Sequence, residues 1–301
     1  MQIDKRNGNV CFNDESHTYF DITNPDSKYI SVTTLIHSFT QPFDKDFWSA
    51  YKALEKLLPK DSWVIEKKSL LNTKRFNKSI LELYNIDEND FNKVQQDILD
   101  SWDEENRKSC DRGTKIHADI ENSFYKNPKD ISLQKFGIGG KFECKKDYSE
   151  LDIEYGVYPE YLIYRESPDG ILKLAGQVDL IVKSGNEIII IDHKTNKKID
   201  LKGGFNTQTK STAKMLYPLN TLDDCNYNHY QLQLSTYAWM LQKLNPNFII
   251  KDLILNHYDH NDNNTIYHCN YLKTEVERML AYYKKQLILK QQKAKRQRIE
   301  Y

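Results

Sequence analysis

The stretch EIIIIDHKT, residues 187–195, places four consecutive isoleucines directly before an aspartate, a histidine and a lysine. A continuous apolar, β-branched run of this kind is typical of a strand that is buried on both faces of a sheet. The segment is therefore predicted to be a core strand, and its charged carboxyl end requires an explanation.

Two further strand-like runs precede this one, GVYPEYLIYRE (156–166) and GILKLAGQVDLIVK (170–183), and the turn sequences SPDG and SGNE join the three. If Gly185-Asn186 forms a two-residue hairpin turn, Asp179 lies directly opposite Asp192. Either plausible register of the preceding turn leaves Glu160 on the face of these two aspartates. Three carboxylates and Lys194 are therefore expected to converge at the end of one strand.

Opposed residues of an antiparallel pair have Cβ atoms about 4.5 to 5.5 Å apart, so Asp179 and Asp192 repel each other unless a cation lies between them. Carboxylate oxygens suit Mg²⁺ or Mn²⁺. Lys194 would lie beside such an ion, where it could act on an attacking water or on the charge of a transition state. The alternative is a salt-bridged strand end, with Lys194 paired to one aspartate.

The rest of the chain is expected to surround this hairpin with helices. Residues 17–32 alternate around an Asn-Pro-Asp turn and predict a small hairpin, and Ser31 is placed as the N-cap of the next helix. Helical spacing continues, with breaks, through about residue 84, and a helix is then predicted from the acidic segment 87–105 past Gly113 to Tyr125. After the three strands we expect a loop over 196–222, a helix over 227–244, two strands across the turn HNDNN, and a closing helix over 273–296.

This order of elements predicts an α/β fold, with a central mixed β-sheet flanked by helices and a helical N-terminal elaboration. We place the division between residues 1–105, the N-terminal hairpin and helical elaboration, and residues 106–301, the core with its C-terminal strands and helix.

Composition narrows the functional classes. The formal net charge is zero, so nucleic-acid binding would have to come from local patches. The five cysteines are scattered without a C-x-x-C pair, which argues against a zinc knuckle or a disulfide framework. No signal peptide or membrane-spanning stretch is recognisable, and a cytoplasmic location, the host cytoplasm for a viral chain, is expected.

One local basic patch follows the strand end. Six lysines lie between residues 194 and 214, against the single acid Asp200. A solvated loop is the simpler interpretation. A track for nucleic-acid phosphates is the functional one.

The sequences GQVDLI and IIDHKT resemble the signature of the PD-(D/E)XK phosphodiesterase superfamily, in which a strand acid and a following acid-x-lysine hold a metal. Three more segments resemble its RecB-like exonuclease branch: GTKIHADIE with His117, YPEYLIY with Glu160, and QLSTYAWML with Gln233 and Tyr237. SVTTLI is similar to a segment of mitochondrial genome maintenance exonucleases and phage-type nucleases. The family core covers about residues 106–245, and the first hundred residues are only partly accounted for.

The resemblance implies a restriction-endonuclease-like core and assigns roles to particular residues. The implied metal ligands are His117, Glu160, Asp179 and Asp192, and the implied catalytic residues are Asp179, Asp192, Lys194, Glu160, Gln233 and Tyr237. The implied DNA-binding residues are Lys197, Lys198, Lys202, Lys210, Gln233 and Tyr237. Gln177 and Thr195 are candidates to support the site, and Glu121 could orient His117.

The chain departs from this family pattern in two ways. Asp192 stands where the family more often has glutamate, which shortens the ligand by one methylene. The spaced cysteines of the iron–sulfur members are missing from the sequence, so no iron–sulfur cluster is expected.

The resemblance implies a Mg²⁺- or Mn²⁺-dependent DNA exonuclease of replication, recombination or phage DNA processing, whose products carry 5′-phosphate and 3′-hydroxyl ends. Its partner would be DNA with a single-stranded segment or a free end. Two alternatives stay open, a structure-specific endonuclease and a non-catalytic nuclease-like scaffold that binds nucleic acid. Polarity, oligomeric state and the choice of DNA over RNA are not fixed by the sequence.

Overall fold

The computed structural model of the protein describes residues 5–13, 15–145, 155–206 and 210–299. Contacts divide the chain into two compact units. Unit 1 comprises residues 1–41 and 115–301, and unit 2 comprises residues 42–114.

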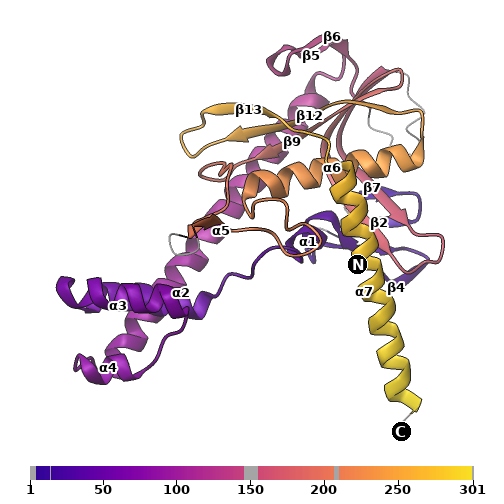
Figure 1. Ribbon diagram of the computed structural model, residues 1–301. Helices are drawn as coiled ribbons and strands as arrows, with labels where there is room; N and C mark the ends of the chain where they lie inside the picture. Colours follow the sequence, from indigo (N-terminus) through magenta and orange to yellow (C-terminus); the bar gives the residue numbers. More distant parts are fainter. Residues whose placement is uncertain (1–4, 14, 146–154, 207–209, 300–301) are drawn as a thin grey trace. The chain divides into compact units, whose positions relative to one another are not determined.

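Unit 1 is built on a nine-stranded sheet in the order β1-β2-β3-β4-β8-β9-β12-β13, with β7 also paired to β8 (Figure 1). The strands are β1 Lys5–Asn7, β2 Val10–Asn13, β3 Thr18–Asp21, β4 Asn24–Ser31, β7 Tyr155–Glu166, β8 Lys173–Ser184, β9 Glu187–Lys194, β12 Ile249–Tyr258 and β13 Asn264–His268. Strands β8 and β9 are antiparallel, whereas β12 runs parallel to β9. The predicted α/β class with a mixed central sheet flanked by helices is confirmed.

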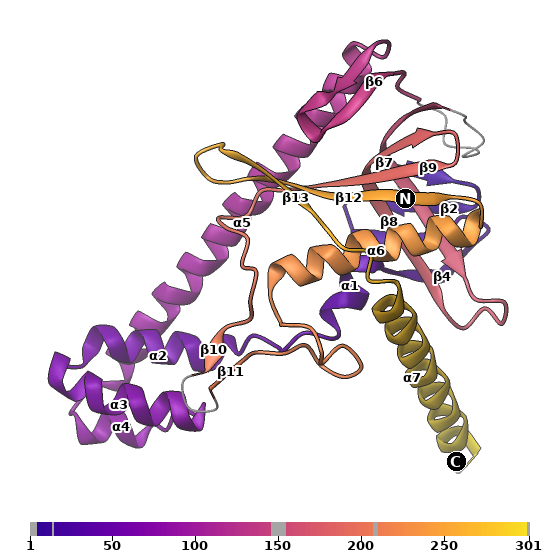
Figure 2. The same cartoon turned by 45° about the horizontal axis from the view of Figure 1, so that its top comes forward.

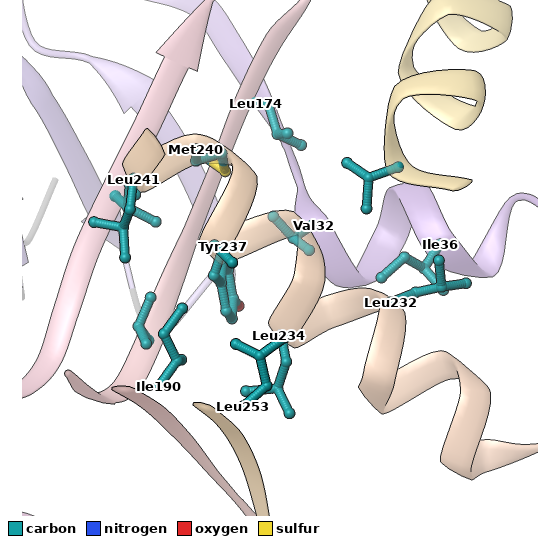
Figure 3. Packing of buried hydrophobic residues seen from close by; sticks show 14 of the residues in the cluster. Val32, Ile36, Leu174, Ile190, Leu232, Leu234, Tyr237, Met240, Leu241 and Leu253 are labelled. Carbon is teal, nitrogen blue, oxygen red and sulfur yellow. The ribbon is translucent and has the colours of Figure 1, made fainter. Parts of the chain in front are cut away.

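Strand β9 is buried on both faces, as its isoleucine run predicts. Ile188 and Ile190 belong to one hydrophobic cluster, and Ile189 and Ile191 contact another. On the first side lie α1 (Val32–His37), α6 (Asn226–Leu244) and α7 (Lys273–Ile299). Figure 2 shows α6 running along this side of the sheet, and Figure 3 shows its apolar side chains meeting Val32 and Ile190.

The second side of the sheet is covered by the carboxyl-terminal part of α5 (Glu88–Lys126) and by the segment after it. This segment consists of β5 (Ile131–Leu133), a 3-10 turn (Gln134–Phe136) and β6 (Ile138–Phe142). Phe124 and Phe136 pack there with Leu180 and Ile191. The end of β9 is therefore enclosed between α6 on one face and α5 on the other.

The N-terminal hairpin forms, but its turn differs from the prediction. Asp21 pairs with Asn24, so the turn consists of Ile22 and Thr23, and the Asn-Pro-Asp segment begins strand β4. The Asp21 carboxylate accepts from the Thr23 backbone N–H at 2.8 Å and from its hydroxyl at 2.6 Å, and this local turn takes precedence over the proline signal. Ser31 caps α1 as predicted, because its hydroxyl accepts from the Thr34 N–H.

This hairpin belongs to unit 1 by its contacts. Ile30 and Ser31 pair in parallel with Leu174 and Ala175 of β8, which makes the hairpin an extension of the central sheet. The sequence-based division after residue 105 groups this hairpin with the helical segment that forms unit 2. Local sequence patterns carry no information on this long-range parallel pairing.

Unit 2 is helical and has its own core. It contains α2 (Lys45–Leu57), α3 (Lys60–Thr73), α4 (Ser79–Leu83) and residues 88–114 of α5. Its core combines aliphatic and aromatic side chains: the ring centroids of Tyr51 and Trp63 are 4.7 Å apart, and Phe76 stacks on Phe91 at 4.9 Å. The predicted helical segments are thus present, and the acidic stretch 87–105 lies within α5.

The remaining predicted elements are also observed among the described residues. The helix expected over 227–244 is α6, the two strands across HNDNN are β12 and β13, and the closing helix is α7. The loop 196–222 contains the short strands β10 (Phe205–Asn206) and β11 (Ser211–Thr212), and residues 207–209 of that loop lie outside the described part. No helix in the described ranges has an apolar stretch sufficient to cross a bilayer.

Candidate metal centre and catalytic site

The β8–β9 register agrees with the turn prediction. Ser184 pairs with Glu187, and the ladder continues in the same register to Leu180 and Ile191. It stops one position before Asp179 and Asp192. The two aspartates therefore lie where the strands stop sharing main-chain hydrogen bonds, and the backbone N–H of His193 donates instead to Asp179 Oδ2 at 2.6 Å.

Glu160 and Asp179 mark a matched irregularity of β7 and β8. Pro159 pairs with Leu180 and Tyr161 with Val178, so the register predicts a Glu160–Asp179 pair that the ladder omits. Glu160 has a φ of 50°, which an L-residue rarely adopts. Strained backbone of this kind is found where surrounding structure enforces it, often at functional sites.

The same irregularity interrupts the alternation of faces in β8. Val178 packs in the cluster beneath α6, whereas Leu180, two residues on, packs in the cluster beneath α5. The strict alternation assumed in counting from the turn therefore does not hold through Asp179. The carboxylate still reaches the end of β9, because His193 N–H binds it.

His117 approaches these carboxylates from α5. Its Nδ1 lies 3.7 Å from Glu160 Oε1 and 3.6 Å from Asp179 Oδ2, and its Nε2 donates to the His193 carbonyl at 3.1 Å. With Nε2 carrying the proton, neutral His117 presents the Nδ1 lone pair to both carboxylates. A second hydrogen bond of this kind is the usual way a metal-ligating imidazole is oriented.

His117, Glu160 and Asp179 form a candidate metal centre, because one ligand atom from each lies within 4.8 Å of the others. Two carboxylate oxygens and an imidazole nitrogen fit a small divalent cation such as Mn²⁺ or Mg²⁺. Three of the four predicted metal ligands thus meet. Asp192 lies outside this trio, and its carboxylate contacts Lys194 and Gln233.

The pKa values at this centre are shifted because several carboxylates lie close together and are largely buried. Burial, and then the charge of Asp192, raise the pKa of Asp179 to about 7. Burial opposes the protonation of His117, but the charges of Asp179 and Glu160 outweigh it and raise the His117 pKa to about 9. The cluster attracts positive charge, whether a proton or a metal ion.

Asp192 and Lys194 form a close pair at the end of β9. Lys194 Nζ lies 2.6 Å from Asp192 Oδ2, and the exposed fractions of the lysine and aspartate side chains are 19% and 1%. Burial opposes the charged form of Lys194, but Asp192 and Asp179 outweigh it and raise its pKa. Lys194 also lies 4.9 Å from the ring centroid of Tyr230, a residue of α6 that carries no sequence signal of its own.

Gln233 and Tyr237 support this pair from α6. Gln233 Nε2 donates to Asp192 Oδ1 at 3.1 Å and lies 3.2 Å from the Tyr237 hydroxyl. Tyr237 is buried, and a Cβ on Gly176 would come within 2.6 Å of its ring, so the glycine leaves space for the tyrosine. From within the core, Gln233 binds Asp192 directly and Tyr237 binds Gln233.

The supporting candidates have definite partners. Gln177 donates to the Glu160 carboxylate. Glu121 accepts from the Tyr125 hydroxyl at 3.1 Å.

Sequence reasoning missed a polar chain behind the site. Asn256, fully buried on β12, donates through Nδ2 to His193 Nδ1 at 2.9 Å. Its orientation is fixed because Asn264 Nδ2 donates to Asn256 Oδ1 at 2.6 Å. His193 in turn binds Asp179 and His117 through its backbone. The alternation of β9 could have indicated a buried His193, but Asn256 carries no local signal.

Some lysines of the loop after Lys194 form ion pairs, and others are exposed. Lys198 pairs with Asp200 at 2.7 Å and Lys214 with Asp223 at 2.5 Å. Lys197, Lys202 and Lys210 are exposed. The loop starts directly after Lys194, and His257 Nε2 donates to the Asn196 carbonyl at 2.7 Å.

Comparison with known proteins gives limited similarity. No protein-family model matches the sequence, and no curated protein matches it significantly. Among solved structures, a protein named SSO0001 aligns with a TM-score of 0.32 and 17% identity over 86% of this chain and 76% of its own. A proposed exonuclease from Eubacterium rectale aligns with a TM-score of 0.33 and 14% identity over 86% of this chain and 80% of its own. TM-scores this low do not establish a shared fold.

Proposed function

We propose that the protein is a divalent-metal-dependent nuclease of the PD-(D/E)XK superfamily that hydrolyses phosphodiester bonds in DNA, acting as an exonuclease of the RecB-like branch. The observation that carries the proposal is the convergence of His117, Glu160 and Asp179 beside the buried Asp192–Lys194 pair. A structural salt bridge accounts for Asp192 and Lys194 alone. It does not account for two further carboxylates and an imidazole that face one another.

The metal supplies part of the chemistry. Held by His117, Glu160 and Asp179, with Asp192 beside it, a divalent cation would lower the pKa of a coordinated water and polarise a phosphate oxygen. Mg²⁺ and Mn²⁺ both fit these ligands.

The protein's own groups provide orientation and charge. Gln233 holds one oxygen of Asp192, and Lys194 holds the other, so the carboxylate is fixed before substrate arrives. The Lys194 ammonium, kept charged by its neighbours, stabilises negative charge that develops on the phosphate. Attack of water oxygen on phosphorus then breaks the P–O3′ bond, and the departing oxygen takes a proton, which leaves 5′-phosphate and 3′-hydroxyl ends.

Digestion of labelled DNA tests the proposal. Linear and covalently closed substrates, single- and double-stranded and labelled at either end, are incubated with Mg²⁺ or Mn²⁺. We expect degradation of linear DNA only, which would also give the polarity, and loss of activity in Lys194→Ala. Cutting of closed circles would replace the exonuclease by an endonuclease, and no cleavage of any substrate would favour a non-catalytic scaffold.

A matched control comes from the opposite end of β9. Lys251 pairs with Glu187 on the surface of the same sheet, where both side chains are largely exposed. Lys251→Ala removes a lysine from an acid–lysine pair without touching the candidate site. Its digestion rate should equal that of the unmodified protein.

A further inference from the structure

The segment between β9 and α6 contains a small hairpin that is tightly anchored at its base. Phe205 pairs with Thr212 and Asn206 with Ser211. A Cβ on Gly203 would lie 2.2 Å from the Ala213 carbonyl oxygen, so only glycine allows the two strands to approach this closely. The Ala213 N–H donates to the Gly204 carbonyl at 2.9 Å.

Two neighbouring aspartates hold this base, and one of them connects it to α6. Asp223 accepts from the Thr212 hydroxyl at 2.8 Å and from Lys214 Nζ at 2.5 Å. The next residue, Asp224, donates its N–H to the Ala213 carbonyl at 2.9 Å, and its carboxylate lies 2.7 Å from His229 of α6. The hairpin is therefore held by polar contacts at its base.

The hairpin carries an aromatic ring that is largely exposed to solvent. Phe205 is 63% exposed, and Leu201, just before the glycines, is 57% exposed. Single exposed apolar residues are common and need no function. Here, however, the ring lies between exposed Lys202 and Lys210 in sequence, on a segment that starts at Lys194.

Connections at the start of the segment keep it next to the site. Asn226, the first residue of α6, accepts from the Asp200 N–H at 2.7 Å and donates to the Lys198 carbonyl at 2.9 Å. Residues 195–200 are thus fixed between the end of β9 and the first turn of α6, the helix that also carries Tyr230 and Gln233.

We propose that the exposed side chains of Phe205, Lys202 and Lys210, on and beside this hairpin, bind single-stranded nucleic acid, with Phe205 stacking on an unpaired base and the lysines contacting nearby phosphates. The choice of ligand rests on the proposed nuclease function. An exposed aromatic ring with exposed lysines close to it in sequence matches the way proteins hold single strands, because every base offers a face for stacking. A duplex does not offer that face along its length.

Binding in the absence of cleavage tests this surface. A labelled oligothymidylate is titrated with the full-length protein in EDTA, and anisotropy gives Kd. Stacking contributes about 1–3 kcal/mol per base, so Phe205→Ala should weaken binding roughly 5- to 150-fold. Phe205→Trp should retain affinity, whereas Phe205→Leu, which keeps the apolar character without the stacking face, should behave like alanine.

An abasic oligonucleotide of the same length separates stacking from a general loss of structure. It offers phosphates but no bases, so the unmodified protein and Phe205→Ala should bind it equally. The double variant Lys202→Gln, Lys210→Gln should lower the salt dependence of binding to both ligands, by about 0.7 in the logarithmic slope for each phosphate that the protein no longer neutralises. Leu244→Ala, an exposed apolar residue at the far end of α6, should change nothing.

The outcomes distinguish this inference from the proposed function. If Phe205→Ala binds oligothymidylate as tightly as the unmodified protein, or loses equal affinity for abasic and normal strands, the stacking surface is wrong. Because the titration needs no hydrolysis, a Phe205-dependent affinity in a protein that cleaves no DNA would uphold the surface and overturn the nuclease. Hydrolysis of a small phosphodiester such as bis(p-nitrophenyl) phosphate should be unaffected by Phe205→Ala.

Discussion

The two ends of strand β9 carry the same kinds of residue in opposite surroundings. At its start, Glu187 pairs with Lys251, and the exposed fractions of the two side chains are 46% and 55%. At its end, Asp192 pairs with Lys194, with exposed fractions of 1% and 19%, and two more carboxylates and a histidine lie nearby. Exposed ion pairs contribute little to stability, whereas a buried charge is costly unless it is compensated. Residue type alone therefore does not identify a site, but burial together with excess negative charge does.

The largest difference between the two ends should appear in catalysis. In the proposed mechanism the Lys194 ammonium faces the reacting phosphate, so we expect Lys194→Ala to lower kcat roughly 10²- to 10⁴-fold. Lys251→Ala should leave kcat unchanged and alter the free energy of unfolding by no more than about 0.5 kcal/mol. Initial rates on linear DNA measure both, and equal rates for the two variants would remove Lys194 from the reaction.

The polar chain behind the site should give the next largest effect. Asn256→Leu takes the donor away from His193, whose backbone orients Asp179 and His117. Loss of such a supporting interaction typically costs about 10- to 100-fold in metal affinity or activity. Manganese affinity should fall while the DNA affinity measured in EDTA stays constant. Asn261→Leu, in the exposed turn after β12, is the control, and equal manganese affinities in the two variants would contradict this role.

The third prediction concerns the free energy of unfolding. Most substitutions in a protein core lower it, whereas replacing Asp179 should raise it. Because burial and Asp192 raise the Asp179 pKa, its ionised form destabilises the metal-free fold. Asp179→Asn should therefore raise the free energy of unfolding in EDTA at about pH 8 by roughly 1–3 kcal/mol, while abolishing stabilisation by Mn²⁺. Urea denaturation measures both effects. A less stable variant in EDTA would show that repulsion does not dominate at this position.

The smallest expected effect is a change of thermal stability with pH, caused by the charged groups at the end of β9. The Asp179 pKa is raised from 3.8 to about 7, so the stability it contributes is complete below 3.8 and is lost as pH rises to 7. The His117 pKa is raised from 6.5 to about 9, so its contribution is complete below 6.5 and is lost as pH rises to 9. The metal-free Tm should therefore fall from about pH 6 to pH 9, and the Tm increase caused by Mn²⁺ should grow.

The exposed His268–Asp252 pair provides the control for this series. His268→Gln should leave the pH dependence of Tm unchanged, because His268 lies outside the candidate metal centre. His117→Gln should flatten it. A series in which His268→Gln has the larger effect would contradict this explanation.

Local sequence patterns predicted the platform of the site well. The isoleucine run identified β9 as a buried strand, and Gly185-Asn186 set the register of the β8–β9 ladder as far as Leu180 and Ile191, one position before Asp179 and Asp192. Ser31 was found as a cap because its signal depends on the neighbouring residues alone.

Features that depend on distant residues were not predictable in the same way. The positive φ of Glu160 coincides with the position that the β7–β8 ladder omits, and a propensity rule gives no hint of it. Asn256 lies far from His193 in sequence, and only the parallel pairing of β12 with β9 brings the two together. The N-terminal hairpin turn was predicted at Asn-Pro-Asp but lies at Ile22-Thr23, because the Asp21 carboxylate binds Thr23. Local signals thus identified the acids, and tertiary contacts supplied their orientation.

The metal centre itself is best tested by crystallography of the protein soaked in Mn²⁺, with anomalous scattering recorded from the metal. We predict an anomalous peak among His117 Nδ1, Glu160 and Asp179, at a coordination distance from each, and no peak beside Glu187 and Lys251. A peak elsewhere, or none among these three residues at a manganese concentration that supports cleavage, would contradict the claim that the end of β9 is a metal centre.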